Sequence, residues 1–216
     1  MPNNQLFKFF VLTILSVSLL ACQSNPKTIS TPEPVVKSTV QSAEQTTSDQ
    51  LEKNEPDPHQ ALYQQAIESS QAGEIEKAIE QFSRVVKDNP SAKNAYTNLG
   101  LLYIHNKQNE AAMEAFINAI KHNTNDAIAY NHLAILQRQQ GEFKIALFNY
   151  YKAINADPDY ANAHLNLGIL LDIYLQDLPL ALEQYEFFQH LTGNNNEQVE
   201  KWIIDIKRRI SAEQGN

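Results

Sequence analysis

Cysteine is nearly absent from this 216-residue chain, in which Cys22 is the only one. The chain therefore cannot form an internal disulfide, a thiolate zinc site or a redox-active cysteine pair. Glycine is also scarce, and the six glycines form neither a phosphate-binding loop nor the turn around a hydrolase serine. These absences lead us to expect no enzymatic activity, no metal and no cofactor.

Basic residues are the minority charge, with 17 Lys and Arg against 25 Asp and Glu, and the net charge is −8. An acidic chain without a dense basic stripe argues against nucleic acid as a partner. The same balance argues against electrostatic adsorption to anionic lipid. No two of the six histidines lie three or four residues apart, the spacing that places zinc ligands on one helix face. We also expect no small-molecule substrate.

Only one stretch is apolar almost throughout, and it lies near the N-terminus at residues 9–21. It is shorter than the roughly 20 residues of a membrane-spanning helix and has the length of a signal-peptide core. The segment ends in Leu-Leu-Ala followed by Cys22. This ending resembles the lipobox of bacterial lipoproteins; the alternative is an ordinary signal peptide with an incidental cysteine.

The lipobox resemblance implies that residues 1–21 are a signal peptide and that Cys22 carries diacylglycerol and a further acyl chain such as palmitate. Several acyl chains together give stable membrane anchoring. Gln23 follows the cysteine, and lipoproteins without Asp at that place usually go to the outer membrane. We therefore expect an outer-membrane anchor facing the periplasm, with the inner membrane as the alternative.

Residues 22–57 form a polar segment rich in Ser, Thr, Gln, Glu and Pro. The segment has no apolar periodicity, so it cannot bury enough surface to fold. We predict a disordered tether with a root-mean-square reach of roughly 30–35 Å.

The rest of the chain repeats a pattern of residue types every 34 residues. An alanine recurs at 78, 112 and 146, an aromatic residue at 82, 116 and 150, and a leucine at 99, 133 and 167. Each unit reads as two antiparallel helices with apolar residues at helical spacing. The glycines at 73 and 141 lie between the helices, where a residue with positive φ ends a helix at low cost. Small residues such as Gly100 and Ala112 should let the two helices approach, with aromatic rings filling the spaces on either side.

These residues resemble the tetratricopeptide repeat, whose first helix carries aromatic–Leu–Gly–Tyr and whose second carries Ala–aromatic–Ala–Pro. The resemblance implies an all-α, right-handed solenoid of four helix hairpins at about 59–92, 93–126, 127–160 and 161–194, within residues 58–193. In the fourth unit the second helix begins one residue late, which predicts a longer turn within 174–179. Residues 195–212 should form a helix that caps the last hairpin. Its basic residues could alternatively contact a partner.

In this family the first helices line the concave face, where the sixth residue is often an Asn that bonds a bound peptide. An apolar row recurs at 34-residue spacing and has polar neighbours. The row is either packed against the next unit or exposed as a binding strip for an amphipathic helix or an apolar peptide. Cations that clamp a terminal carboxylate in some relatives are replaced by Asn94, Ile128 and Asn162, so we expect no such clamp. The predicted groove residues are Ile67, Asn98, Leu101, Asn131, His132, Ile135, Arg138, Asn166 and Ile169.

Together these patterns predict a membrane-anchored periplasmic scaffold that binds a peptide or helix of an envelope-assembly protein. The plan is similar to that of pilus-assembly lipoproteins and of lipoproteins that recruit peptidoglycan enzymes. The alternatives are a structural lipoprotein that associates with itself and a factor for pilus secretin assembly. Fold alone does not choose among these roles.

Overall fold

The structure is a computed structural model that describes residues 58–92 and 94–215. Within these ranges the chain forms nine α-helices and one π-helical segment, without a strand. They are α1 (Pro58–Gln71), α2 (Ile75–Asp88), α3 (Ala95–His105), α4 (Asn109–His122), α5 (Ala127–Gln139), α6 (Phe143–Ala156), α7 (Ala161–Ile169), η1 (Leu170–Leu175), α8 (Leu178–Leu191) and α9 (Glu197–Gln214). The predicted signal peptide, Cys22 and the predicted tether lie outside the described residues.

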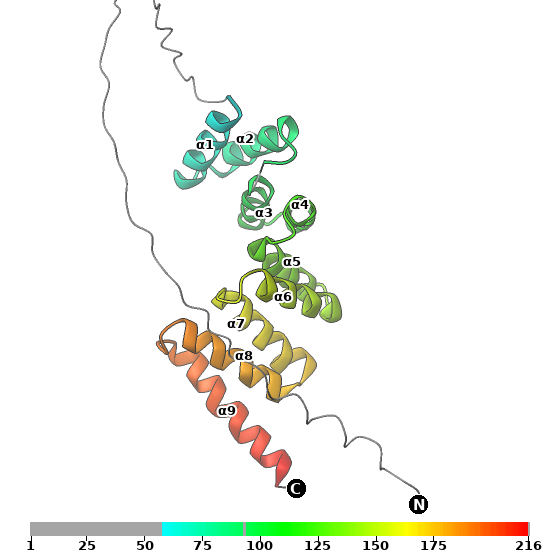
Figure 1. Ribbon diagram of the computed structural model, residues 1–216, viewed down its shortest axis with the longest axis vertical. Helices are drawn as coiled ribbons and strands as arrows, with labels where there is room; N and C mark the ends of the chain where they lie inside the picture. The colour runs from blue at the N-terminus through cyan, green and yellow to red at the C-terminus, as the bar shows by residue number, and fades with distance from the viewer. Residues whose placement is uncertain (1–57, 93, 216) are drawn as a thin grey trace, which may run out of the picture. The chain divides into compact units, whose positions relative to one another are not determined.

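The helices pack in chain order as four hairpins, α1 with α2, α3 with α4, α5 with α6, and α7 with α8 (Figure 1). The second helix of each hairpin also contacts the first helix of the next. Each hairpin therefore buries its apolar faces against its neighbours and not against one central core, which is the arrangement of a solenoid. The all-α solenoid that the repeats predicted is confirmed. No helix in the described ranges is long and apolar enough to cross a membrane.

Two glycines bring the helices of a hairpin close together. A Cβ atom at Gly100 would lie 2.6 Å from the nearest ring atom of Phe116, and one at Gly168 would lie 2.6 Å from Tyr185. Both rings are buried, so they cannot shift without disturbing close-packed neighbours. This refines the sequence prediction, which put the rings to either side of the small residues: each ring occupies the space left by the missing side chain.

One residue between the helices of each hairpin has a left-handed backbone. Gly73 and Gly141 have φ of +76° and +83°, as predicted. Lys107 (φ +59°) and Gln176 (φ +57°) occupy the corresponding places in the other two hairpins. A non-glycine residue in this region costs roughly 1–2 kcal/mol, so the second and fourth hairpins carry strain that the first and third avoid.

The extra residue of the fourth unit lies in a helix, and the prediction of a longer turn is wrong. The left-handed turn residue Gln176 follows Gly141 by 35 residues, where the earlier spacing is 34. Before it, α7 continues as the π-helical segment Leu170–Leu175, and a π-helical turn holds more residues than an α-helical one. The turn between η1 and α8 is consequently short, and both flanking helices keep their buried faces.

Helix α9 packs on α8 and covers the end of the last hairpin. Val199, Ile203 and Ile206 are buried in the same core cluster as the α8 residues, and the ring of Trp202 lies 5.4 Å from that of Tyr185. The helix begins at Asn196, whose side chain accepts bonds from two backbone N–H groups of the first turn. The apolar side of α9 therefore covers the last hairpin.

The basic residues of α9 are largely occupied within the chain. Lys207 pairs with Glu186 at 2.8 Å, Arg208 with Asp205 at 2.6 Å, and Arg209 with Asp172 at 2.7 Å. The first two pairs are exposed and contribute little to stability. The pairing leaves this helix a weaker candidate for a basic partner-binding face than the row of first helices.

Candidate functional site

Each first helix keeps one side accessible, and the same four repeat positions form it in every hairpin. We call this surface the first-helix face. On α5 it consists of Ile128, His132, Ile135 and Gln139, whose spacing of three and four residues places them on one side of the helix. The members on the other helices are Gln60, Gln64, Ile67 and Gln71 on α1, Asn94, Asn98, Leu101 and His105 around α3, and Asn162, Asn166, Ile169 and Ile173 on α7 and η1.

The predicted apolar row runs along the middle of this face and is half-buried. Ile67 packs on the core cluster of the first hairpin, Leu101 on that of the second, and Ile135 and Ile169 on that of the last two. Both readings of the row are therefore partly right, because each side chain rests on the core and still presents part of its surface. Neighbouring first helices contact each other directly, so the row is continuous along α3, α5 and α7.

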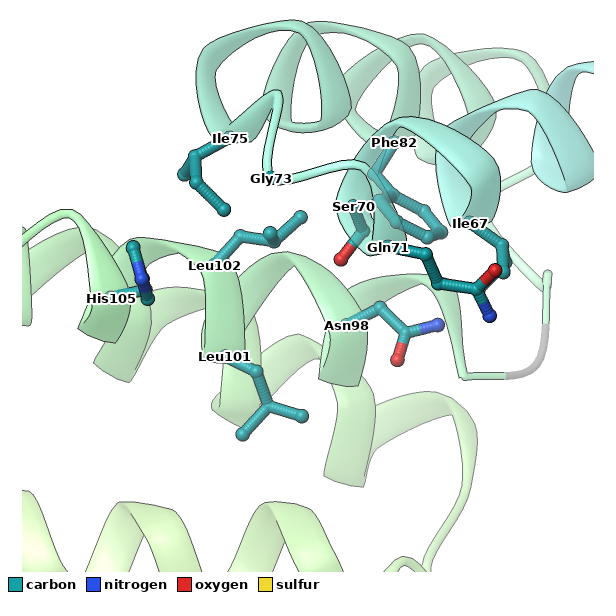
Figure 2. Close-up of a pocket in the computed structure, with 10 residues that line it drawn as sticks. All are labelled: Ile67, Ser70, Gln71, Gly73, Ile75, Phe82, Asn98, Leu101, Leu102 and His105. Atoms are coloured by element: carbon teal, nitrogen blue, oxygen red, sulfur yellow. The ribbon is translucent and has the colours of Figure 1, made fainter.

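A cavity of about 500 Å³ opens on this face between the first hairpin and α3 (Figure 2). Three of the predicted groove residues, Ile67, Asn98 and Leu101, line it. The other lining residues are Ser70, Gln71, Gly73, Ile75, Phe82, Leu102 and His105. Because the lining contains no Asp, Glu, Lys or Arg, the cavity suits an uncharged and mainly apolar side chain.

The predicted asparagines tie neighbouring first helices together. The Asn98 side-chain amide donates to the Tyr63 hydroxyl at 3.1 Å, and that of Asn166 donates to Asn131 Oδ1 at 3.1 Å. Asn98 and Asn166 remain half-buried on the face. Asn131 does not: it is 1% exposed and its own amide lies 3.4 Å from the Tyr160 hydroxyl. The structure thus removes Asn131 from the predicted contact surface, because its polar atoms are used inside.

His132 lies on the face, but one side of its ring is covered. The ring stacks on Phe116 with centroids 5.6 Å apart and planes 15° apart. Burial lowers the pKa of His132, and the nearby carboxylate of Asp126 acts in the opposite direction. The imidazole is therefore held towards its neutral form, which can both donate and accept a hydrogen bond.

Arg138 lies beside the face, three residues after Ile135. Its guanidinium carbon is 5.8 Å from the centre of the Tyr174 ring, a cation–π distance. Inside the protein, burial raises the pKa of Tyr150 to about 12, and the positive charge of Arg138 opposes that rise. Arg138 is consequently half-buried among aromatic rings, and not on the open surface as the sequence suggested.

Sequence reasoning missed two exposed apolar residues of the face. Ile128 is 43% exposed and Ile173 is 60% exposed. Tyr174, next to Ile173 in the π-helical segment, is 44% exposed. Extending the row by two helical turns before Ile135 and one after Ile169 would have found Ile128 and Ile173, since they lie seven residues before Ile135 and four after Ile169.

The titratable residues of the described ranges do not gather into a metal site, because no three His, Cys, Asp or Glu side chains come together there. The polar groups of the face are amides and the imidazoles of His105 and His132, and the guanidinium of Arg138 lies beside it. Amides and imidazoles can form hydrogen bonds with a peptide backbone, and apolar grooves accept side chains in known peptide-binding modes.

Two segments match known family patterns. Residues 63–128 match the family described as tetratricopeptide repeat, and residues 136–171 match one described as TPR repeat. The chain is a tetratricopeptide-repeat protein. No curated protein sequence is measurably similar to it. The matched segments span most of the four hairpins, so the family assignment rests on the repeats that form the first-helix face.

Solved structures of this repeat family share the fold. The PilF protein of Pseudomonas aeruginosa is 18% identical with a TM-score of 0.61, and covers 71% of this chain and 69% of its own. MamA of Desulfovibrio magneticus is 22% identical with a TM-score of 0.55, and the coverages are 64% and 78%. The first repeat domain of Spaghetti (RPAP3), solved with an HSP90 peptide, is 17% identical with a TM-score of 0.50, and the coverages are 54% and 90%. At these identities the likeness concerns the fold.

Proposed function

We propose that this tetratricopeptide-repeat protein is a membrane-anchored scaffold whose first-helix face binds a peptide or helix of an envelope protein in the periplasm. The observation that carries the proposal is the apolar row of that face, which recurs on all four first helices and crosses the contacts of α3 with α5 and of α5 with α7. Ile67, Leu101, Ile135 and Ile169 expose part of their surface along it. Ile128 and Ile173, which are 43% and 60% exposed, add apolar surface to the same face, and contiguous exposed apolar residues mark interaction sites.

The surroundings of the row fit a peptide better than a small molecule. Asn98 and Asn166 use their amide nitrogens to hold neighbouring helices, which leaves their Oδ1 atoms to accept from a peptide N–H. The cavity between the first two hairpins takes an apolar side chain. A related fold holds a peptide in the RPAP3 complex. We propose no catalytic role, since tetratricopeptide repeats generally act as scaffolds.

The proposed anchor is the lipid on Cys22, supported by the lipobox resemblance and by the lack of any other cysteine. With Gln23 after it, we propose the periplasmic side of the outer membrane. Mass spectrometry of the protein isolated from membranes should show cleavage before Cys22 and added acyl mass. A Cys22→Ser variant should lose that mass and leave the membrane fraction. Wild-type protein with an unmodified Cys22 would contradict the proposed lipid anchor. It would not bear on the proposed binding by the first-helix face.

The binding role is tested by photo-crosslinking in living cells with the anchor intact. A photoreactive residue at Ile173 lies on the first-helix face, and one at Ile117 is a matched control. Ile117 is 53% exposed, similar to Ile173, but lies on the second helix α4. We expect a discrete envelope-protein adduct from Ile173 and none of the same mass from Ile117.

Glutamate substitutions on the first-helix face and away from it test whether the apolar surface is needed for binding. Ile128→Glu should abolish the adduct at Ile173, while Ile117→Glu should not, and both variants should fold because both positions are exposed. An adduct at Ile173 that survives Ile128→Glu would contradict binding through the row. Adducts that consist only of a second copy of this chain would support the alternative of self-association.

A further inference from the structure

We infer that Arg138 makes the first-helix face selective for a peptide that carries an acidic side chain next to its apolar residues. This inference rests on the proposed function and specifies the chemistry of the partner. It does not follow from the repeat family's terminal-carboxylate clamp, whose cation positions are filled here by Asn94, Ile128 and Asn162.

The guanidinium of Arg138 has no acidic partner within the described residues. No salt bridge reaches its nitrogens. Its charge and a hydrogen bond from it lower the pKa of the buried Tyr150 hydroxyl, which is an uncharged partner and leaves the positive charge uncompensated. Arg138 as a whole is partly exposed, so its charge is only partly desolvated. A partly desolvated cation gains more from an incoming carboxylate than a fully exposed one does.

The acid best placed by sequence to neutralise Arg138 is already occupied. Asp172 stands at the corresponding position of the next hairpin, 34 residues on. Its Oδ1 accepts from Arg209 Nη1 at 2.7 Å, and its side chain is only 14% exposed. In a chain of net charge −8, an arginine left without a carboxylate at a predicted binding face is therefore informative.

The surroundings of Arg138 define what else the peptide must carry. The guanidinium lies against Tyr174, and Tyr174 in turn contacts Phe143, with ring centroids 4.7 Å apart. Ile135, three residues earlier on α5, is adjacent on the helix surface, and Ile173 is the most exposed apolar residue of the face. A carboxylate at Arg138 thus sits beside apolar contacts on both sides.

The occupant is an acidic side chain within a peptide, not a free C-terminus. Arg138 is one cation, whose planar fork can bind one carboxylate through two parallel bonds. No lysine or arginine occupies a position of the first-helix face itself, where the residues are Asn, Gln, His, Ile and Leu. A single arginine with apolar neighbours matches a Glu or Asp flanked by apolar residues.

The test is a library of twelve-residue peptides displayed as N-terminal phage fusions, which have no free C-terminus, selected on the purified full chain. We expect enrichment of peptides with apolar residues and at least one Glu or Asp. A selected peptide, synthesised with an amidated C-terminus, is then titrated by fluorescence anisotropy. Changing its acid to the amide should weaken binding about tenfold or more. Arg138→Gln should weaken it equally, and the two changes together should cost no more than either alone.

Arg84→Gln is the matched control, because it removes the same charge from an exposed site on α2 and should leave the affinity within about twofold. Arg138→Lys should restore only part of the affinity, since an ammonium group lacks the fork. Changing the acid on the peptide tests the contact without altering the fold of the protein.

The outcomes separate the inference from the proposed function. If selected peptides lose binding to Ile128→Glu but bind Arg138→Gln as tightly as wild type, the inference is wrong and the face still binds peptides. If the peptide whose acidic side chain was changed to the amide regains affinity when its C-terminus is a free carboxylate, the internal acid is not the group that Arg138 selects. If no peptide is enriched, or enrichment ignores Ile128→Glu, the proposed function fails as well.

Discussion

Replacing Gly100 with alanine separates two opposite expectations. By helix propensity alone, alanine in α3 should stabilise the protein by about 1 kcal/mol. In the structure, however, a Cβ atom there would lie 2.6, 2.8 and 2.9 Å from three ring atoms of Phe116, which is fully buried. Overpacking of a filled core costs about 1–3 kcal/mol. Because three ring atoms are crowded at once, we take the upper part of that range and expect a net loss of about 1–2 kcal/mol.

Urea unfolding followed by circular dichroism measures this loss as a fall in the denaturation midpoint. A double-mutant cycle identifies its cause. Phe116→Leu should cost less in the Gly100→Ala background than in wild type, because the smaller side chain removes the crowding. A Gly100→Ala protein as stable as wild type, or more stable, would refute the packing argument. Additive effects of the two changes would also refute it.

Three further predictions concern a histidine, the π-helical segment and a strained turn. Because burial lowers the pKa of His132, the unfolded state binds more protons than the folded state. The free energy of unfolding should therefore fall as the pH drops below about 6.5. Urea titrations between pH 7 and pH 5 should show a smaller fall of this free energy for His132→Asn than for wild type. Deleting Ile173 should convert the π-helical turn to an α-helical one, and circular dichroism should show a folded protein. Deleting Gln139 from α5, as the control, should shift the buried face of α6 and unfold the protein. Lys107→Gly should raise the urea midpoint by an amount equivalent to up to about 1 kcal/mol, since it relieves the positive φ; an unchanged or lower midpoint would show that the turn is unstrained.

The repeats made the fold predictable, because residues that pack in a solenoid recur at fixed spacing. Gly73 and Gly141 were recognisable as left-handed turn residues for the same reason. Lys107 was not, since lysine carries no preference for that conformation and only its place in the repeat requires it. The extra residue of the fourth unit was visible as a count. Whether it enlarges the turn or the helix depends on which option keeps the flanking helices buried, and that is decided by packing.

The candidate site was predictable in outline and not in detail. The apolar row was visible from its spacing, but its half-buried state depends on contacts between hairpins. Asn131 and Asn166 were both predicted as groove residues, yet Asn131 is buried and accepts a hydrogen bond from Asn166. Likewise, Asp172 occupies the repeat position of Arg138 in the next hairpin, but no repeat pattern shows that it pairs with Arg209 in the cap helix. Such differences depend on which side chains the fold places within hydrogen-bonding or ion-pairing distance of each other.

The order in which the helices stack also decides how the protein carries mechanical load. A pull between the N-terminal side of the described region and a partner held at α5 and η1 passes through α1 to α4. Within the described residues, helix α1 buries only Ala66 and Ser69 fully and packs only on helices that follow it, whereas α8 is covered by α9. Under force the first hairpin should therefore detach before the hairpins at which we propose that the partner binds, and it would act as an extensible link.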